Sequence, residues 1–278
     1  MLRLSLVAVA AMTALTAGAH ASASAPRRIV SLSPTATESL YAIGAGRQVV
    51  AVDEQSDYPK RAPRTKLSGY TPNVEAIAAY RPDLVLLEFD PGDTAAGLRK
   101  LGIRVIIQST AKDLPGAYAQ IRRLGRVTGH LKSANALVKR MKGQIARAVK
   151  STPKRRLSVY HELTPDFYSA TSSTFIGRIY RLFGLRNIAD AAEGAGSGFP
   201  KLSAEYIVAS NPSLIVLADT RCCGQTAALV RDRPGWSSIA AVRTGAIASV
   251  DDSVASRWGP RVVTFVRAVA ATLKRVGR

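Results

Sequence analysis

Short runs of branched apolar residues alternate along this chain with segments in which apolar residues recur every three or four positions. The runs are typical of strands buried in a parallel sheet, and the longer spacing is typical of amphipathic helices. Because the two patterns alternate, the chain is predicted to be an α/β protein with mostly parallel sheets. The predicted strands are 28–32, 49–52, 84–87, 103–107, 157–160, 214–218 and 246–250.

One helical segment near the middle of the chain is longer than the others. Its apolar residues keep their spacing without a break, which predicts a single amphipathic helix over about 131–150. A helix at this place would be a stiff connector between two halves. We therefore divide the chain into an N-terminal α/β lobe (26–130), a connecting helix (131–152) and a C-terminal α/β lobe (153–278).

A pattern over residues 73–87 recurs over residues 203–217, 130 residues further along the chain. Both copies have Glu, Ile, Ala, Pro and two Leu residues in the same register, and the glutamates are Glu75 and Glu205. A period this long is not that of a solenoid. It predicts two similar lobes, each with one acidic residue at an equivalent place, and a cleft between them.

Each repeated glutamate follows a residue that can cap a helix, Asn73 or Ser203. A carboxylate in the first turn stabilises a helix by about 0.3–1 kcal/mol through the helix dipole. This effect explains a glutamate near each helix start. It does not explain why both lobes have one in a chain with only 19 acidic residues.

The first 25 residues are predicted to be a secretory signal peptide. A short basic start precedes an apolar run, and small residues then recur at the spacing of a cleavage site. The alternative is a retained membrane anchor. No cysteine lies near the cleavage site and no later segment is long and apolar enough to span a bilayer. We expect a mature protein without a lipobox that is soluble and periplasmic or otherwise extracytoplasmic.

The net charge is +20, with 39 basic residues against 19 acidic ones. Such a balance is found in proteins that bind nucleic acid or anionic surfaces. The basic residues are scattered, however, and the aromatic and basic motifs of RNA-binding domains are absent, so nucleic-acid binding is not expected. A secreted basic module that binds polyanions stays open as an alternative class, and the charge itself has no explanation in the sequence.

The only two cysteines, Cys222 and Cys223, are adjacent. In an oxidising compartment they could form a vicinal disulfide. Two free thiols or a site for a soft metal are the alternatives. No histidine stands near them in the sequence, which argues against a metal.

Ligands of open parallel sheets bind beyond the carboxyl ends of the strands. That rule selects the segments 88–92, 161–162, 219–225 and 252–258. Aromatic residues gather in the predicted loops, which favours a flat or bulky ligand, although any one ring could simply fill a gap in the core. The loop aromatics are Tyr58, Tyr70, Phe89, Tyr168, Phe199 and Trp258.

No catalytic constellation is found, so the chain is not expected to be an enzyme. His161-Glu162 begins like a zinc-protease motif, but Pro165 stands where the second histidine is needed. A nucleophile elbow, a phosphate-binding loop and a dinucleotide-binding fingerprint are all absent. We name no catalytic residue and no metal ligand.

Taken together, the motifs resemble those of the helical-backbone (class III) solute-binding proteins of ABC importers, and most of all the cobalamin-binding proteins. The resemblance covers residues 27–276. It rests on the repeat and on Leu32-Ser-Pro34, Thr37-Glu38, Asp57-Tyr58-Pro59, Arg233-Pro-Gly-Trp236 and Arg257-Trp-Gly-Pro-Arg261.

This resemblance implies two Rossmann-like lobes joined by one long rigid helix, with a small-molecule ligand held between them. It also implies that Glu75 and Glu205 dock onto arginines of a permease dimer, which works with ATPase subunits. The binding protein itself is then expected to be a monomer without a resident cofactor.

The resemblance further implies a cobalamin or other corrinoid ligand, with haem or a ferric siderophore as the alternative. Tyr58, Tyr70, Phe199 and Arg257 match positions of the cobalamin pocket, but Tyr70 and Phe199 stand where the cobalamin binders have tryptophan. Haem would need an axial ligand, for which Tyr70 and His161 are the candidates.

Overall fold

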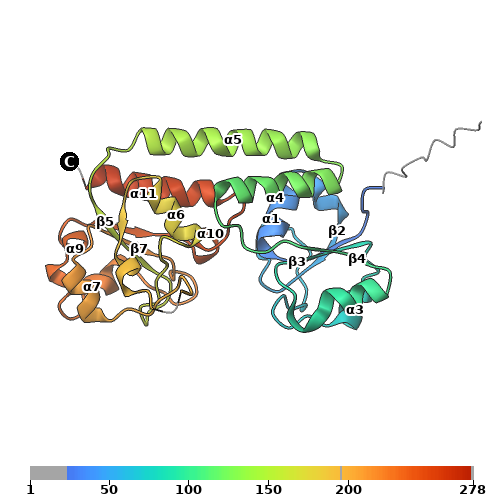
Figure 1. Cartoon of the computed structure of the whole chain (residues 1–278), viewed down its shortest axis with the longest axis horizontal. Helices are drawn as coiled ribbons and strands as arrows, with labels where there is room; N and C mark the ends of the chain where they lie inside the picture. Colours follow the sequence, from blue (N-terminus) through green and yellow to red (C-terminus); the bar gives the residue numbers. More distant parts are fainter. Residues whose placement is uncertain (1–23, 195, 277–278) are drawn as a thin grey trace, which may run out of the picture.

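The computed structural model describes residues 24–194 and 196–276. Most of the predicted signal peptide lies outside these residues. Two α/β lobes lie side by side beneath one long helix, as Figure 1 shows. The predicted fold class is confirmed, because each lobe has a four-stranded parallel sheet with helices packed around it.

The two sheets have the same strand order. The N-terminal sheet is β2-β1-β3-β4 and the C-terminal sheet is β6-β5-β7-β8. Every pairing is parallel. The strands are β1 (Ile29–Leu32), β2 (Val49–Val52), β3 (Leu84–Leu87), β4 (Arg104–Ile107), β5 (Ser158–Glu162), β6 (Arg186–Asn187), β7 (Leu214–Leu217) and β8 (Ile247–Ser249).

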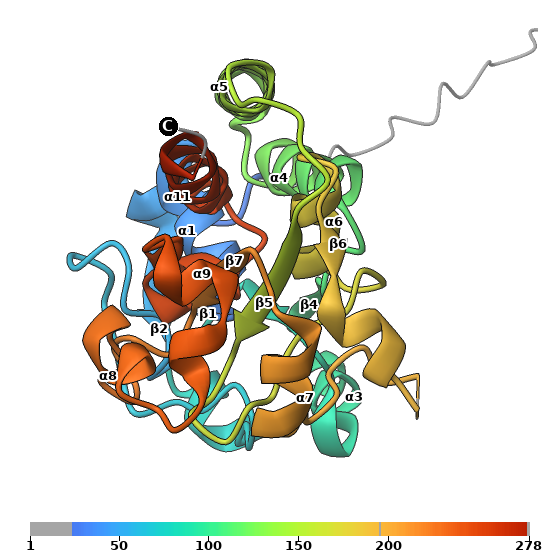
Figure 2. The same ribbon diagram turned by 90° about the vertical axis from the view of Figure 1, so that its left-hand side faces the viewer.

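Helices connect the strands and cover the sheets (Figure 2). They are α1 (Pro34–Ala42), α2 (Val74–Ala78), α3 (Thr94–Lys100), α4 (Leu114–Val127), α5 (Leu131–Lys150), α6 (Phe175–Arg181), α7 (Ala204–Ser210), α8 (Ala227–Arg231), α9 (Ala240–Arg243), α10 (Asp252–Ala255) and α11 (Val262–Arg275). The sequence patterns had not predicted α4, β6, α8, α9 or α10.

The sequence repeat is also a repeat of structure. Asn73 caps α2 through the amide of Ala76, and Ser203 caps α7 through the amide of Tyr206. Both helices are followed by an inner strand of their sheet, β3 or β7. Even the residue before each repeated proline has the same backbone: Arg81 and Asn211 both have a left-handed conformation, with φ of 47° and 44°. The restriction that proline places on its neighbour is therefore met by a left-handed residue and not by an extended one.

The connecting helix α5 spans Leu131–Lys150, the range predicted from its periodicity, and ends two residues before the boundary set for the connecting segment. Its buried face is made of Ala134, Leu137, Val138, Met141 and Ile145. It packs on α4 from the first lobe and on α11 from the second. Because the buried cluster beneath it includes residues of both lobes, the two lobes share one apolar core along α5.

Helix α4 packs tightly on α5 at Gly125, where an added Cβ would lie 2.4 Å from the Cβ of Ala134. We predict that Gly125→Ala lowers the free energy of unfolding by about 1–3 kcal/mol, the usual effect of overpacking. Gly143→Ala in α5 is the matched control, since its Cβ would meet only the end of the Arg147 side chain. The control should be neutral or slightly stabilising, because alanine favours the helix. Urea unfolding of both variants checks this, and equal stability would contradict it.

Candidate ligand-binding site

A buried carboxylate joins the two lobes. Glu38, on α1 of the N-terminal lobe, is 2% exposed. Arg261 of the C-terminal lobe donates to it twice, from Nε at 3.0 Å and from Nη2 at 2.6 Å. Arg257 of the same lobe donates from Nη1 at 3.0 Å. Two guanidinium groups of one lobe thus enclose a single carboxylate of the other.

A second interlobe contact extends this network toward solvent. Arg257 Nη1 also donates to Asp57 Oδ1 at 2.9 Å, and Arg221 Nη1 donates to Asp57 Oδ2 at 3.2 Å. Arg221 in turn pairs with Asp251 at 3.0 Å. Burial opposes ionisation of Asp57, but the hydrogen bond from Arg257 and the nearby arginine charges outweigh it, so the pKa of Asp57 is lowered.

Next to this network, a hollow of about 400 Å³ opens between the lobes. The rings of Tyr70 and Phe89 lie on its N-terminal side, with their centroids 5.7 Å apart. Arg257 and Trp258 line it from the C-terminal lobe. Its lining residues are Leu32, Pro34, Thr35, Asp53, Gln55, Gly69, Tyr70, Glu88, Phe89, Cys222, Asp252, Ser253, Ser256, Arg257 and Trp258.

Three carboxylates line this hollow. Asp53 follows β2, Glu88 follows β3, and Asp252 begins α10. Burial raises the pKa of Asp53 to about 6, and the charge of Glu88 adds to the effect. Burial also raises the pKa of Glu88, although Ser33 Oγ donates to it at 2.8 Å. The one arginine in the lining, Arg257, is already bonded to Glu38 and Asp57, so the hollow mainly offers hydrogen-bond acceptors.

A second hollow of about 380 Å³ adjoins the first, since Ser256 and Trp258 line both. Phe199 lines it together with Leu163, Phe175 and Ile176 of the C-terminal lobe. Trp258 is 6% exposed, and its indole nitrogen donates to Gln120 Oε1 of the N-terminal lobe at 2.9 Å. Its ring is therefore held rigidly at the point where the two hollows meet.

The adjacent cysteines form a disulfide at the rim of the first hollow. The sequence had left this pairing open. Asp252 holds the loop in place, because its carboxylate accepts from the backbone amides of Cys222 at 2.6 Å and Arg221 at 2.9 Å. The disulfide loop is thus connected through Arg221 to the same interlobe ion pairs.

The remaining aromatics named from the sequence lie apart from the two hollows. Tyr58 lies beneath Arg261, with the guanidinium carbon 4.4 Å from the ring centroid, and lines a neighbouring hollow of about 670 Å³. Tyr168 is 42% exposed and packs on Lys201 at 5.6 Å. Of the seven predicted ligand contacts, the structure brings together Tyr70, Phe89, Phe199, Arg257 and Trp258.

His161 and Glu162 were selected as strand-end residues, but both are fully buried inside the C-terminal lobe. His161 Nδ1 lies 2.5 Å from Tyr180 Oη, and burial lowers its pKa to about 3. Glu162 is paired with Arg233 through two contacts of 2.6 Å. The suggestion of His161 as an axial haem ligand is therefore wrong, because its ring does not reach the cleft.

Both repeated glutamates are exposed to solvent. Glu205 has its pKa lowered by hydrogen bonds from its own backbone amide and from Ser203. Its helix α7 lies on the side of the molecule away from α5 (Figure 1). Glu75 is on α2, which packs against α3 on that same side. The two carboxylates thus belong to the far ends of the lobes and are not lining residues of the cleft hollows.

Sequence reasoning gave no site role to Glu38, Asp53 and Asp57, although Glu38 and Asp57 stand in its family motifs, and it selected Asp252 only as part of the strand-end segment 252–258. The sequence signal for them was the rarity of acidic residues, since a carboxylate in a chain of net charge +20 is expected to have a cationic partner or a functional role. Within residues 24–194 and 196–276, no group of three or more His, Cys, Asp or Glu residues is arranged to hold a metal ion.

Two α/β lobes with a lined cleft between them and a single long connecting helix define a bilobal solute-binding protein. The chain belongs to the periplasmic binding protein family, whose model matches residues 29–254. The resemblance drawn from the sequence motifs is thereby confirmed.

Two curated relatives cover most of the chain. The uncharacterized ABC transporter substrate-binding lipoprotein YvrC of Bacillus subtilis (strain 168) is 30% identical over 259 residues, which are 89% of this chain and 80% of the relative. A cobalamin-binding protein of Halobacterium salinarum is 33% identical over 250 residues, which are 86% of this chain and 67% of the relative. Since the first of these is named a lipoprotein, the expected absence of a lipobox here stays a prediction.

Solved structures share the fold. The periplasmic vitamin B12 binding protein BtuF of Vibrio cholerae has a TM-score of 0.74 at 22% identity and covers 91% of this chain and 98% of its own. The periplasmic haem-binding protein RhuT from Roseiflexus sp. RS-1 has a TM-score of 0.77 at 24% identity, with 91% and 99% covered. At these identities the likeness shows the architecture and does not distinguish the ligands. Among the described helices, none has the length and apolar character required to cross a bilayer.

The raised pKa of Asp53 predicts a pH dependence of stability. A carboxyl group that binds its proton more tightly when folded favours the folded state at low pH, and this benefit is lost between the unfolded pKa of about 4 and the folded pKa of about 6. Asp53→Asn should therefore be more stable than the natural chain by about 2–3 kcal/mol at pH 7, and equally stable below pH of about 4. Chemical unfolding at both pH values measures this, and a difference that does not change with pH would contradict it.

Proposed function

We propose that the chain is the extracytoplasmic solute-binding protein of an ABC importer, and that it binds cobalamin or a related corrinoid in the cleft between its lobes. The chemistry of the first hollow carries this proposal. Its walls combine the rings of Tyr70 and Phe89 with the carboxylates of Asp53, Glu88 and Asp252. A corrinoid has a broad apolar face and a rim of carboxamide groups, whose N–H donors match carboxylate acceptors.

Haem is the alternative ligand within the same family, because Tyr70 could coordinate iron. The two propionates of haem are anionic, however, and would face three carboxylates and an arginine that is already paired twice. Removing anionic groups from water without a cationic partner is costly. The same argument applies to a ferric siderophore with a net negative charge. The lining of the cleft therefore favours the corrinoid.

The proposed partner is a permease dimer with its ATPase subunits. Glu75 and Glu205 stand at equivalent places on the two lobes, exposed and away from the cleft hollows. Charged pairs buried at an interface couple by about 1.5–7 kcal/mol, far more than an isolated surface pair. One carboxylate on each lobe would let a pseudo-symmetric protein meet a symmetric membrane partner, with the cargo held between the two contacts.

Titration of the purified protein with cyanocobalamin and with haemin tests the ligand. We expect tight corrinoid binding that weakens by up to about tenfold in Phe89→Ala, because the truncation removes an aromatic contact worth about 0.5–1.5 kcal/mol. Tyr168→Ala is the matched control, since its ring lies outside both hollows, and it should bind as the natural chain does. Tight haemin binding that is lost in Tyr70→Phe would contradict the corrinoid proposal.

The docking role is tested by reversing both repeated charges, Glu75→Lys with Glu205→Lys. Transport in cells that carry the cognate importer should be abolished, while corrinoid affinity in solution stays unchanged. Glu54→Lys with Asp232→Lys is the control, because it reverses one exposed carboxylate in each lobe and changes the net charge equally. Loss of ligand affinity in the first variant with an intact fold, or equal loss of transport in both, would contradict the docking role.

A further inference from the structure

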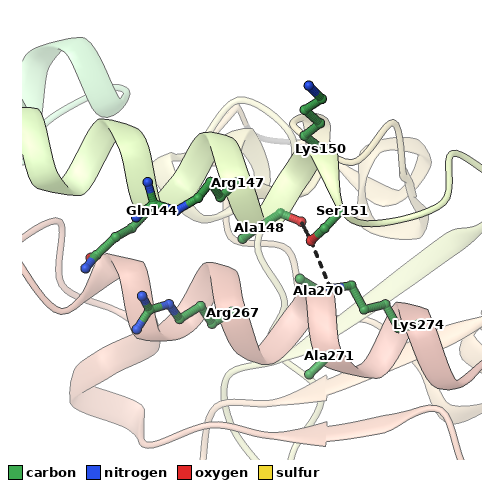
Figure 3. Close-up of a pocket in the computed structure, with 9 residues that line it drawn as sticks. All are labelled: Gln144, Arg147, Ala148, Lys150, Ser151, Arg267, Ala270, Ala271 and Lys274. Carbon is green, nitrogen blue, oxygen red and sulfur yellow. Dashed lines mark hydrogen bonds between the residues drawn. The ribbon is translucent and has the colours of Figure 1, made fainter.

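A groove separate from the cleft hollows lies on the side of the molecule away from α7. It has a volume of about 680 Å³ and runs between the connecting helix α5 and the C-terminal helix α11 (Figure 3). Neither the ligand nor the permease of the proposed function uses it. Its lining residues are Gln144, Arg147, Ala148, Lys150, Ser151, Arg267, Ala270, Ala271 and Lys274.

The groove carries four cations and no acidic residue. Arg147 and Lys150 come from α5, and Arg267 and Lys274 come from α11. All four are exposed. The sequence around them is acid-free over long stretches, because no Asp or Glu occurs between Asp113 and Glu162 or after Asp252. Positive charge is thus concentrated where these two helices meet, although the chain as a whole has acidic residues elsewhere.

The groove stays open because its floor is made of small side chains. Ala148 on α5 faces Ala270 and Ala271 on α11, so no long side chain fills the space between the helices. At one end Lys274 Nζ donates to Ser151 Oγ at 2.8 Å, which joins the two helices. At the other end Gln144 and Arg267 also line an adjoining hollow of about 330 Å³, whose lining includes Arg61 of the N-terminal lobe and the buried, arginine-paired Glu38.

Arg147 and Arg267 thus lie toward one end of the groove and Lys274 at the other, whereas Lys150 points away from α11 (Figure 3). An arginine guanidinium binds phosphate through two parallel hydrogen bonds, and lysine adds a point charge. We propose that this groove binds the phosphate groups of a linear anionic polymer of the cell envelope. The cations from Lys274 through Arg147 and Arg267 to Arg61 would contact successive phosphates of one extended chain.

A flat anionic membrane is a poorer fit to the same charges, and this choice rests on the proposed docking role. Helix α7 with Glu205, and α3 beside the helix of Glu75, lie on the side away from α5 in Figure 1. A bilayer against the α5 face would turn both glutamates away from the membrane that holds the permease. A polymer in the groove leaves the opposite face free, so polymer binding and docking are compatible.

Binding of linear inorganic polyphosphate to the full chain tests the proposal. Fluorescence anisotropy of end-labelled polymer is measured over a range of salt concentrations, with vesicles of phosphatidylglycerol as the second probe. We expect binding that weakens steeply with salt, by about 0.7–0.9 in the logarithmic slope for each phosphate contacted. Arg147→Gln with Arg267→Gln should weaken binding by roughly tenfold or more and reduce the slope by about 1.5.

Arg99→Gln with Lys100→Gln is the matched control, because it removes two exposed cations from α3, far from the groove. This control should keep polyphosphate affinity. Equal weakening in both variants would mean a general effect of net charge and would overturn the site, as would the absence of salt-sensitive binding. Binding to vesicles in preference to polyphosphate would assign the groove to a membrane instead. Corrinoid affinity, measured in parallel, should be unchanged in both variants. An absence of polyphosphate binding would therefore count against the groove without counting against the proposed function.

Discussion

The position of one buried carboxylate determines how the two lobes meet. Glu38 is enclosed by Arg257 and Arg261 of the opposite lobe, with contacts of 2.6–3.0 Å. Such an arrangement adds little net stability, because the desolvation of three charged groups offsets their attraction. Removing one partner is nevertheless costly, since it leaves a buried charge unpaired. The network therefore destabilises other orientations of the lobes more than it stabilises this one, and so it defines the shape of the cleft.

The candidate ligand site is connected to this network through neighbouring residues of the chain. Arg257 is followed directly by Trp258, whose ring separates the two hollows and whose indole is bonded to Gln120 of the other lobe. Asp57 connects the same arginine to Arg221 and so to the disulfide loop. Charge is also divided in space: three carboxylates line the first hollow, whereas the lining of the groove between α5 and α11 has four basic residues and no acidic one. The chain thus has one surface suited to hydrogen-bond donors and another suited to anions.

Sequence patterns predicted the architecture well where the signal was local or repeated. The periodicity of α5, the buried runs of β3 and β7, and the equivalence of Glu75 and Glu205 can all be seen without coordinates. The site was harder to predict because its residues meet across the chain: Glu38 and Arg261 are 223 positions apart. No sequence pattern near Asp53 predicts that its side chain is buried. Aromatic content alone also does not distinguish Phe89, which lines the cleft, from Tyr168, which does not. Helix α4 was missed although Asp113 caps it and Pro115 lies in its first turn, where proline is tolerated; only Gly125 departs from its pattern, at the close contact with α5.

The ties between the lobes lie close together, and this has a mechanical consequence. Helix α5 joins the lobes covalently, and Glu38 lines a hollow together with Gln144 of that helix, so the ionic tie lies near the covalent one. Two lobes joined near one edge rotate about that edge, so the displacement of a residue grows with its distance from it. Glu75 and Glu205 lie on the side of each lobe away from that edge. A change of the angle between the lobes is therefore largest in the spacing of these two carboxylates, which under the proposed docking role lets the permease distinguish one lobe angle from another.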